Sequence, residues 1–196
     1  MTWILIALIV LIVLYFFVTY NGFVTGRNRA EEAWADIEVQ LKRRYDLIPN
    51  LVNTVKGYAA HESTAFEKVT EARAKAISAQ GTPGAAQAEG ELSGTLKSLF
   101  AISEAYPELK ANTNFLALQT ELSDTENKIQ AARRFYNGNV RDYNTKLDRS
   151  PSNLIGHLFG FQKKNYFDLA ADDAAQQPVQ SSVLTPQLFN GDIVHT

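Results

Sequence analysis

Residues 34–55 read WADIEVQLKRRYDLIPNLVNTV, and this stretch decides the fold. Its apolar side chains recur at spacings that alternate between three and four, which is typical of a helix that packs one face against partners. The same seam can be followed over residues 26–79, where apolar side chains hold eleven of thirteen positions and Arg44 and Glu62 are the exceptions. A charge in a helical seam is costly unless it is paired, so it often fixes register or partner choice. Alternatively, each side chain snorkels to the bundle edge. Both residues are therefore candidate interaction residues.

Pro49 lies inside this seam. A proline removes one helical hydrogen bond and bends the helix axis. Because the seam keeps its phase across Pro49, the sequence predicts one long kinked helix over residues 26–79. The alternative is two helices, with Pro49 at the first position of the second.

Two further helices are expected to fold back on the first. Residues 80–84 contain two glycines and one proline, which predicts a break, and a second helix follows over about residues 85–105 until Tyr106-Pro107 ends it. A third helix is expected over about residues 108–147. Each helix has a single apolar face, so the fold class is all-α: an elongated antiparallel bundle over residues 26–150. The third helix is rich in amides that either bridge helices or face solvent: Asn112, Asn114, Asn127, Asn137, Asn139 and Asn144.

The N-terminus predicts a transmembrane anchor over residues 1–25. Residues 3–18 carry no charge, and with their apolar continuation they suffice to span about 30 Å of hydrocarbon. Trp3 at one end and Tyr20 with Phe23 at the other are expected at the membrane interface. A cleaved signal peptide is the alternative, but no basic residue precedes the apolar run. Because Arg27 and Arg29 follow the span, we expect a single pass with the N-terminus outside and the bundle in the cytoplasm.

The C-terminal part changes character after Pro151. Residues 151–169 are crowded with apolar side chains, so this segment is expected to pack on the bundle or on the membrane. Residues 170–196 are rich in Ala, Asp, Gln and Ser and contain no Lys or Arg, which predicts a disordered tail.

No motif for catalysis, a cofactor or a metal is found. The chain has no cysteine, and none of its three histidines has a second histidine at metal-binding spacing. Neither a glycine-rich phosphate loop nor a Gly-x-Ser-x-Gly elbow is present. A formal net charge of −2 argues against a nucleic-acid partner. The sequence therefore predicts a protein that is not an enzyme and has neither cofactor nor metal.

Further motifs run through the helices and the segment after them. They are Tyr20-Asn21, Trp34-Ala35-Asp36-Ile37, Asp46-Leu47-Ile48-Pro49-Asn50, Asn114-Phe115-Leu116, Tyr136-Asn137, Phe159-Gly160-Phe161 and Tyr166-Phe167. Together they resemble the LemA family over about residues 20–167. Ser150 departs from the family pattern, which usually has Phe before this proline. The resemblance implies a bacterial membrane-anchored helical protein whose signature includes Arg44, Pro49 and Asn50 and in which no catalytic residue carries over. Pro49 and Asn50 therefore join Arg44 and Glu62 as candidate interaction residues.

Two functions follow as hypotheses. The first is an interaction or scaffold protein of the bacterial inner membrane that self-associates or binds an envelope protein. It is favoured by the charged seam and by the lack of a recognisable active site. The second is a membrane signalling or envelope-stress regulator in which the helix transmits a state from span to bundle.

Overall fold

The protein is described by a computed structural model over residues 1–82 and 84–167. Within these ranges every regular element is a helix, so the prediction of an all-α fold is confirmed. The predicted tail over residues 170–196 lies outside the described residues. The elements are α1 (Thr2–Lys56), α2 (Ser63–Ala79), α3 (Ala85–Ile102), the short 3₁₀ helix η1 (Ser103–Ala105), α4 (Pro107–Lys110), α5 (Thr113–Asp148) and α6 (Ser152–Leu158).

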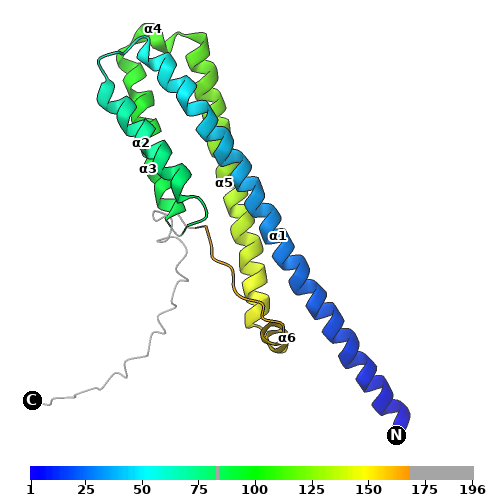
Figure 1. The fold of residues 1–196 in the computed structure, drawn as a ribbon. Coiled ribbons are helices and arrows are strands. Elements are labelled where there is room, and N and C mark those ends of the chain that lie inside the picture. Colours follow the sequence, from blue (N-terminus) through cyan, green and yellow to red (C-terminus); the bar gives the residue numbers. More distant parts are fainter. Residues whose placement is uncertain (83, 168–196) are drawn as a thin grey trace, which may run out of the picture.

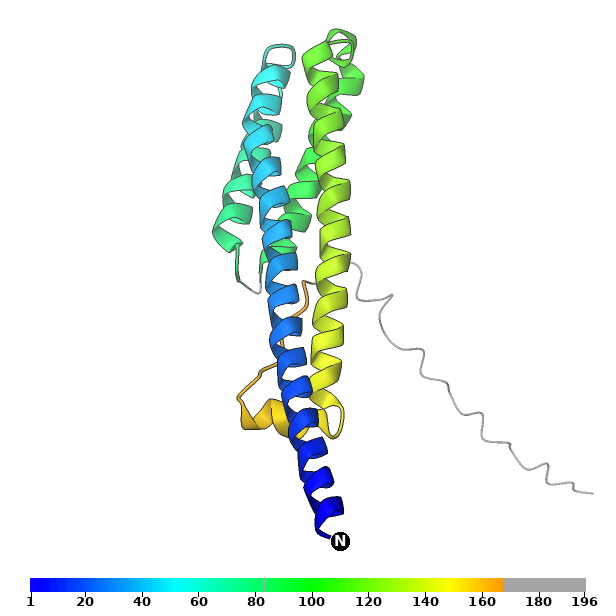
Figure 2. The same cartoon turned by 90° about the vertical axis from the view of Figure 1, so that its right-hand side faces the viewer.

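The molecule is a rod built on two long antiparallel helices, α1 and α5, which lie side by side (Figure 1). The hairpin of α2 and α3 packs beside the half of this pair that lies farther from the N-terminus, and α6 crosses at the other end (Figure 2). Beyond α6 the N-terminal part of α1 projects alone. At 1.5 Å per residue, the 55 residues of α1 extend about 80 Å.

The prediction of one helix over residues 26–79 was wrong. Pro49 lies inside α1, which continues to Lys56, and the chain then turns over residues 57–62 before α2 begins. Neither sequence alternative placed the break there. The seam keeps its phase because α2 folds back with the expected side chains, Val69, Ala72 and Ala76, still buried in the core.

Pro49 is accommodated because another helix satisfies the backbone group that it leaves unpaired. In an unbroken helix the amide of residue 49 would donate to the carbonyl of Tyr45, but proline has no N–H. Arg73 on α2 supplies the missing donor, with its Nε 2.8 Å from the Tyr45 carbonyl oxygen. The bond therefore also ties α2 to α1.

The other two helices follow the sequence prediction, with one interruption. Residues 85–105 form α3 and η1 as expected. The predicted helix over residues 108–147 is divided into α4 and α5, because the side chain of Asn112 caps α5 by accepting a hydrogen bond from the Phe115 amide at 3.0 Å. Asn112 Nδ2 also donates to the hydroxyl of Tyr58, 2.8 Å away, which fixes the turn before α2.

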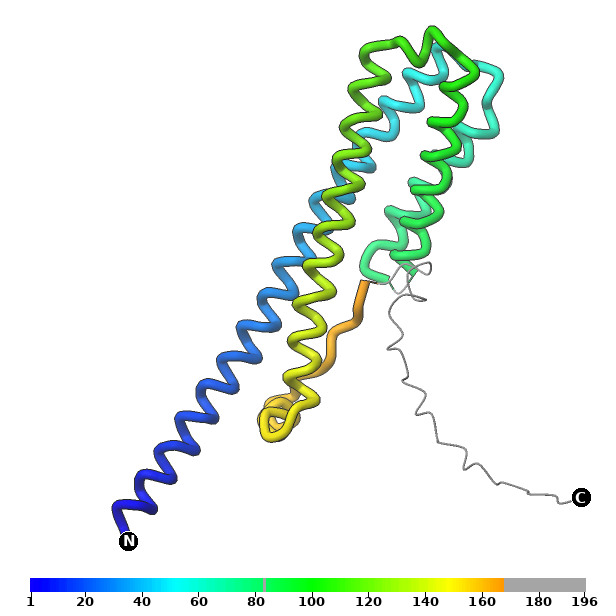
Figure 3. Tube along the Cα trace, turned by 180° about the vertical axis from the view of Figure 1, so that it is seen from behind, coloured from blue at the N-terminus to red at the C-terminus, as the bar shows by residue number. Residues whose placement is uncertain are grey.

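Residues 161–167, here called the strap, run back along α1 and α5 toward the α2–α3 turn (Figure 3). Two amides of α5 hold its backbone. Asn144 donates to the Lys164 carbonyl and accepts from its amide, both at 2.9 Å. Asn137 does the same for Phe167, at 3.1 and 2.9 Å. Seven helical residues and three extended residues both advance about 10 Å, so the two pairs stay in register.

The strap ends in an aromatic cluster on the main core. The ring of Phe167 is buried, 5.6 Å from that of Trp34, and the guanidinium of Arg133 lies 4.8 Å above it. Trp34 in turn packs edge-on against Tyr136 at 5.2 Å. The apolar segment expected over residues 151–169 therefore packs on the bundle through its strap portion.

Residues at the lower end of the bundle form a second, smaller core, here called the foot. Its buried members are Phe23, Tyr143, Leu147 and Ile155. Gly156 is required in the foot, because a Cβ there would meet Leu147 Cδ2 at 2.6 Å and Phe23 Cζ at 3.3 Å. The foot fixes α6 against α1 immediately above the free N-terminal part.

Candidate functional site: a buried charge cluster beside an open groove

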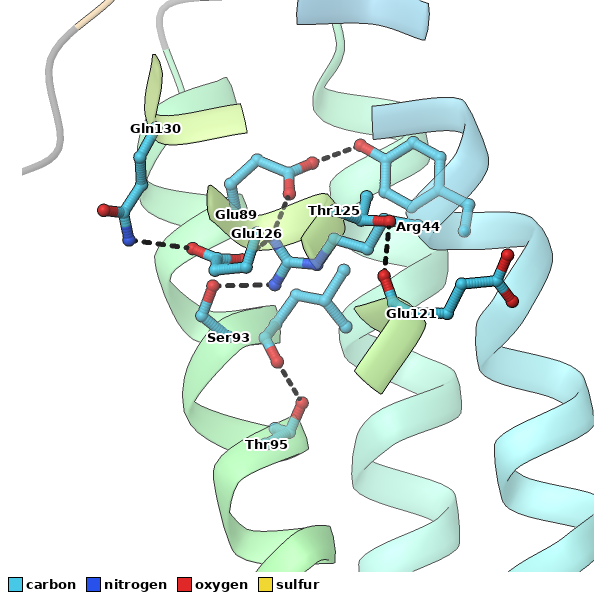
Figure 4. Close-up of polar contacts among 10 residues, drawn as sticks. Arg44, Glu89, Ser93, Thr95, Glu121, Thr125, Glu126 and Gln130 are labelled. Carbon is cyan, nitrogen blue, oxygen red and sulfur yellow. Dashed lines mark hydrogen bonds and ion pairs between the residues drawn. The ribbon is translucent and has the colours of Figure 1, made fainter. Parts of the chain in front are cut away.

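Arg44 lies at the centre of the four-helix part of the bundle, and its side chain is only 2% exposed. For Arg44 the snorkelling alternative is therefore wrong. Its Nη1 lies 3.3 Å from Glu89 Oε2 on α3 and 3.1 Å from Glu126 Oε2 on α5. Nη2 donates to Ser93 Oγ at 2.7 Å. Figure 4 shows the side chains of α3 and α5 converging on the guanidinium of Arg44, which α1 contributes.

Glu89 is the second buried charge of the cluster. Its other carboxylate oxygen accepts a hydrogen bond from the hydroxyl of Tyr45, the neighbour of Arg44 on α1. Burial raises the pKa of the Glu89 carboxyl, while the Tyr45 hydroxyl and the Arg44 guanidinium partly offset that rise. Burial also raises the pKa of Tyr45, with Glu89 adding to the effect, so Tyr45 stays protonated and donates at neutral pH.

A groove of about 700 Å³ between α3 and α5 opens onto this cluster. Arg44 and Ser93 belong to its lining, and most of the remaining lining residues are polar: Lys97, Gln119, Thr120, Ser123, Asp124, Glu126, Asn127 and Gln130, together with Leu96, Phe100 and Leu122. The groove therefore presents hydroxyl and amide groups over a buried cation, and these groups are suited to hydrogen bonding with another surface.

Both carboxylates in the groove already have cationic partners. Glu126 pairs with Arg44, and Asp124 lies 2.8 Å from Lys128, which lowers the pKa of Asp124. Among the described residues, no group of three or more His, Asp or Glu side chains could hold a metal ion. Each of these two groove carboxylates is therefore neutralised by a neighbouring cation.

The remaining predicted interaction residues do not join this cluster. Pro49 lies one helical turn after Tyr45, a member of the cluster, and the Tyr45 carbonyl accepts a hydrogen bond from Arg73. Asn50 is exposed on α1, where its backbone carbonyl accepts from Thr54 Oγ1 at 2.9 Å. Glu62 precedes α2 and accepts a long 3.4 Å hydrogen bond from the hydroxyl of Tyr106.

The predicted membrane residues lie in three different environments. The N-terminal part of α1 is long and apolar enough to cross a bilayer. Trp3 is exposed at its free end. Tyr20 packs against Phe159, with ring centroids 4.8 Å apart. Phe23 is fully buried in the foot, so its ring packs against protein, contrary to the prediction.

Sequence reasoning missed the partners of Arg44. Glu89 belongs to the seam of α3, because Ala85, Glu89, Leu92, Leu96 and Leu99 are all buried and follow one another at spacings of four and three. A carboxylate in that position was the signal, since a buried charge requires an opposite charge on a facing helix. The partner on α5, Glu126, is 35% exposed and resembles an ordinary surface residue in the sequence.

Comparison with known proteins gives a consistent assignment. The chain is similar to magnetosome protein MamQ of Magnetospirillum gryphiswaldense, with 26% identity over 87% of this chain and 70% of the relative. Magnetosome protein MamQ 2 of Paramagnetospirillum magneticum is 27% identical over the same shares. Protein LemA of Metamycoplasma hominis is 24% identical over 80% of this chain and 69% of its own length. The family model for the LemA family matches residues 33–181, and the chain belongs to the LemA family.

Proposed function

We propose that this protein is a membrane-anchored helical interaction protein of the bacterial envelope that has no catalytic activity. It holds a rigid helical surface next to the bilayer and acts by self-association or by binding an envelope protein. The observation that carries the proposal is the polar groove between α3 and α5, whose floor is the buried Arg44 cluster.

The groove suits a protein partner for two reasons. Its exposed amides and hydroxyls, such as Asn127 and Ser123, can pair with polar side chains of a helix laid along α3 and α5. Its walls stay fixed because Arg44 crosslinks α1, α3 and α5 from within. A pre-formed surface loses little entropy when a partner binds.

In-cell photocrosslinking tests this proposal. A photoreactive phenylalanine analogue would replace Ser123 or Asn127 in the full chain, with Asp36 as a matched control that is also exposed but lies on α1 outside the groove. We expect products from the two groove positions and none from Asp36. Mass spectrometry then separates a second copy of this chain from another envelope protein. Equal yields at all three positions, or no product at either groove position, would refute the proposal.

The proposed topology places the N-terminus outside and the bundle in the cytoplasm. It rests on Arg27 and Arg29 directly after the apolar part of α1. Because the chain has no cysteine, Asp36→Cys introduces a single exposed thiol on the bundle. A membrane-impermeant maleimide should label it only after the inner membrane is permeabilised. Labelling in cells whose outer membrane alone is permeable would reverse the orientation.

A second candidate function, transmission of a state along α1, is favoured by one observation. The helix is continuous from Thr2 to Lys56, through Gly22 and Gly26. One alanine inserted between Val10 and Leu11 rotates the outer half of the span by about 100° and leaves the bundle contacts in place. Transmission predicts that crosslinking from Asn127 changes in this variant, whereas a static scaffold predicts the same products and yields.

A further inference from the structure

The apolar run of α1 is too short to cross a bilayer before it meets the rest of the protein. From Trp3 to Phe16 the helix advances about 20 Å at 1.5 Å per residue, whereas the hydrocarbon core of a bilayer is about 30 Å thick. At Phe16 the chain already has a neighbour, because the ring of Phe159 lies 5.5 Å away. A bilayer that starts at Trp3 therefore extends to about Phe23, which is the level at which α6 packs.

The outer face of α6 matches that position. Ser152, Ile155 and Gly156 point inward and are buried. Leu154 and Leu158, one helical turn apart, are 69% and 71% exposed, and Phe159 beside them is 47% exposed. In water, such a group of exposed large apolar side chains would be unfavourable.

The charge pattern around α6 is that of a segment at a membrane surface. Residues 150–162 contain no Asp, Glu, Lys or Arg. Basic side chains lie on both sides of this interval, with Arg149 exposed before it and Lys163 exposed after it, where Lys163 pairs with Asp148 at 2.9 Å. The long side chain of Arg149 can reach lipid phosphates at this level while the apolar face stays in the acyl region.

From these observations we infer that α6 is an interfacial membrane helix, which inserts Leu154, Leu158 and Phe159 into the leaflet on the bundle side of the span. The occupant of this face is the lipid bilayer, since the face continues the lipid-exposed surface of α1 at the same depth. The protein thus contacts the membrane twice, and the foot sets the tilt of the bundle above it. This inference does not depend on the proposed interaction function.

Site-directed spin labelling of the full chain tests the inference. Single-cysteine variants Leu154→Cys and Leu158→Cys would carry a nitroxide in nanodiscs of phosphatidylcholine and phosphatidylglycerol, and no native thiol competes for the label. Leu8→Cys, 55% exposed in the span, is the lipid reference. Phe135→Cys and Val39→Cys, 60% and 61% exposed on the bundle, are the aqueous references.

Collision with oxygen, which is enriched in lipid, is compared with collision with a water-soluble nickel chelate. We expect the ratio of oxygen to nickel collisions at residues 154 and 158 to exceed the two aqueous references several-fold and to approach the ratio at residue 8. A ratio equal to the aqueous references would overturn the inference. Exclusion of both agents would also overturn it, because it would mean that a protein covers α6.

Discussion

Replacing Arg44 with methionine should show how far the bundle depends on its buried charge cluster. The change keeps an unbranched apolar stem but removes the guanidinium and its contacts with Glu89, Glu126 and Ser93. Removing one partner of a buried ion pair typically costs about 3–5 kcal/mol, because the other charge is left unpaired. Glu126 is 35% exposed and can be hydrated, so we expect the lower end, about 3 kcal/mol. For a chain of this size that lowers Tm by about 10 °C.

A second substitution should reverse part of this loss. In Arg44→Met the buried carboxylate of Glu89 loses its ion-pair partner and keeps the hydrogen bond from the Tyr45 hydroxyl. Glu89→Gln removes that charge while keeping an acceptor for Tyr45. The double variant should therefore be about 1–2 kcal/mol more stable than Arg44→Met alone, although it carries one more substitution.

Thermal unfolding of the full chain in nanodiscs, followed by circular dichroism at 222 nm, measures these differences. The matched control is Arg43→Met, because Arg43 also makes an ion pair, 2.8 Å from Glu121, but both side chains are more than 40% exposed. That exposed pair should contribute at most about 1 kcal/mol. Equal losses for Arg43 and Arg44, or a double variant no more stable than Arg44→Met, would refute the reasoning.

Four further predictions follow from the same structure. Asn144→Ala removes both hydrogen bonds to Lys164 and should loosen the strap at a cost of about 1–3 kcal/mol. The loosening should appear as faster amide exchange over residues 161–167. Asn139→Ala should leave that exchange unchanged, because the Asn139 side chain donates to Phe135 in its own helix. Gly156→Ala should destabilise the foot by about 1–3 kcal/mol, because the added Cβ overpacks against Leu147. Gly94→Ala should instead stabilise the chain by about 0.5–1 kcal/mol, because position 94 is mid-helix and an added Cβ meets no neighbouring atom. A reversed order of the two stabilities in urea unfolding would contradict the foot geometry. Arg73→Met should cost about 1 kcal/mol, because it removes the side-chain donor from the Tyr45 carbonyl. In a Pro49→Ala background that cost should shrink by at least half, since alanine at position 49 restores the backbone N–H. Equal costs in both backgrounds would show that the Arg73–Tyr45 hydrogen bond does not compensate for the proline. Finally, burial raises the pKa of Glu89 in the folded protein above the 4.5 of an ordinary glutamate. Between pH 4.5 and this raised pKa the native state binds more protons than the unfolded state, so stability falls as pH rises. Glu89→Gln should flatten this slope in urea midpoints measured across that pH range, and an unchanged slope would assign it to other groups.

The sequence predicted the fold class and the candidate span, because both depend on local patterns. The apolar run before Phe23 and the seam from Trp34 to Val55 mark which side chains avoid water. The turn between α1 and α2 was missed for the same reason. A heptad pattern reports which face is buried, and α2 buries the same face after it folds back, so the pattern continues while the axis reverses.

The candidate site could be predicted only in part. Arg44 was identified from its seam position, but Glu89 and Glu126 are 45 and 82 residues farther along the chain, and only the fold brings the three together. The amides of α5 posed a similar problem. Asn137 and Asn144 bind the strap, whereas Asn139 bonds only to its own helix, although all three are the same residue type within eight positions.

The strap, the foot and the cluster divide the rod into three levels that stabilise α1 in different ways. Near the membrane, aromatic packing holds α1 against α6; in the middle, the strap fills the side that the α2–α3 hairpin does not reach; above it, Arg44 binds three helices through charge. Apolar contacts tolerate small rotations, whereas a guanidinium with fixed hydrogen bonds does not. The register of α1 is therefore set at Arg44, which lies about 30 Å along the helix from Phe23 in the foot at 1.5 Å per residue. Any movement of the span must therefore be absorbed below that level, where the strap and the foot hold α1 through side-chain amides and aromatic packing.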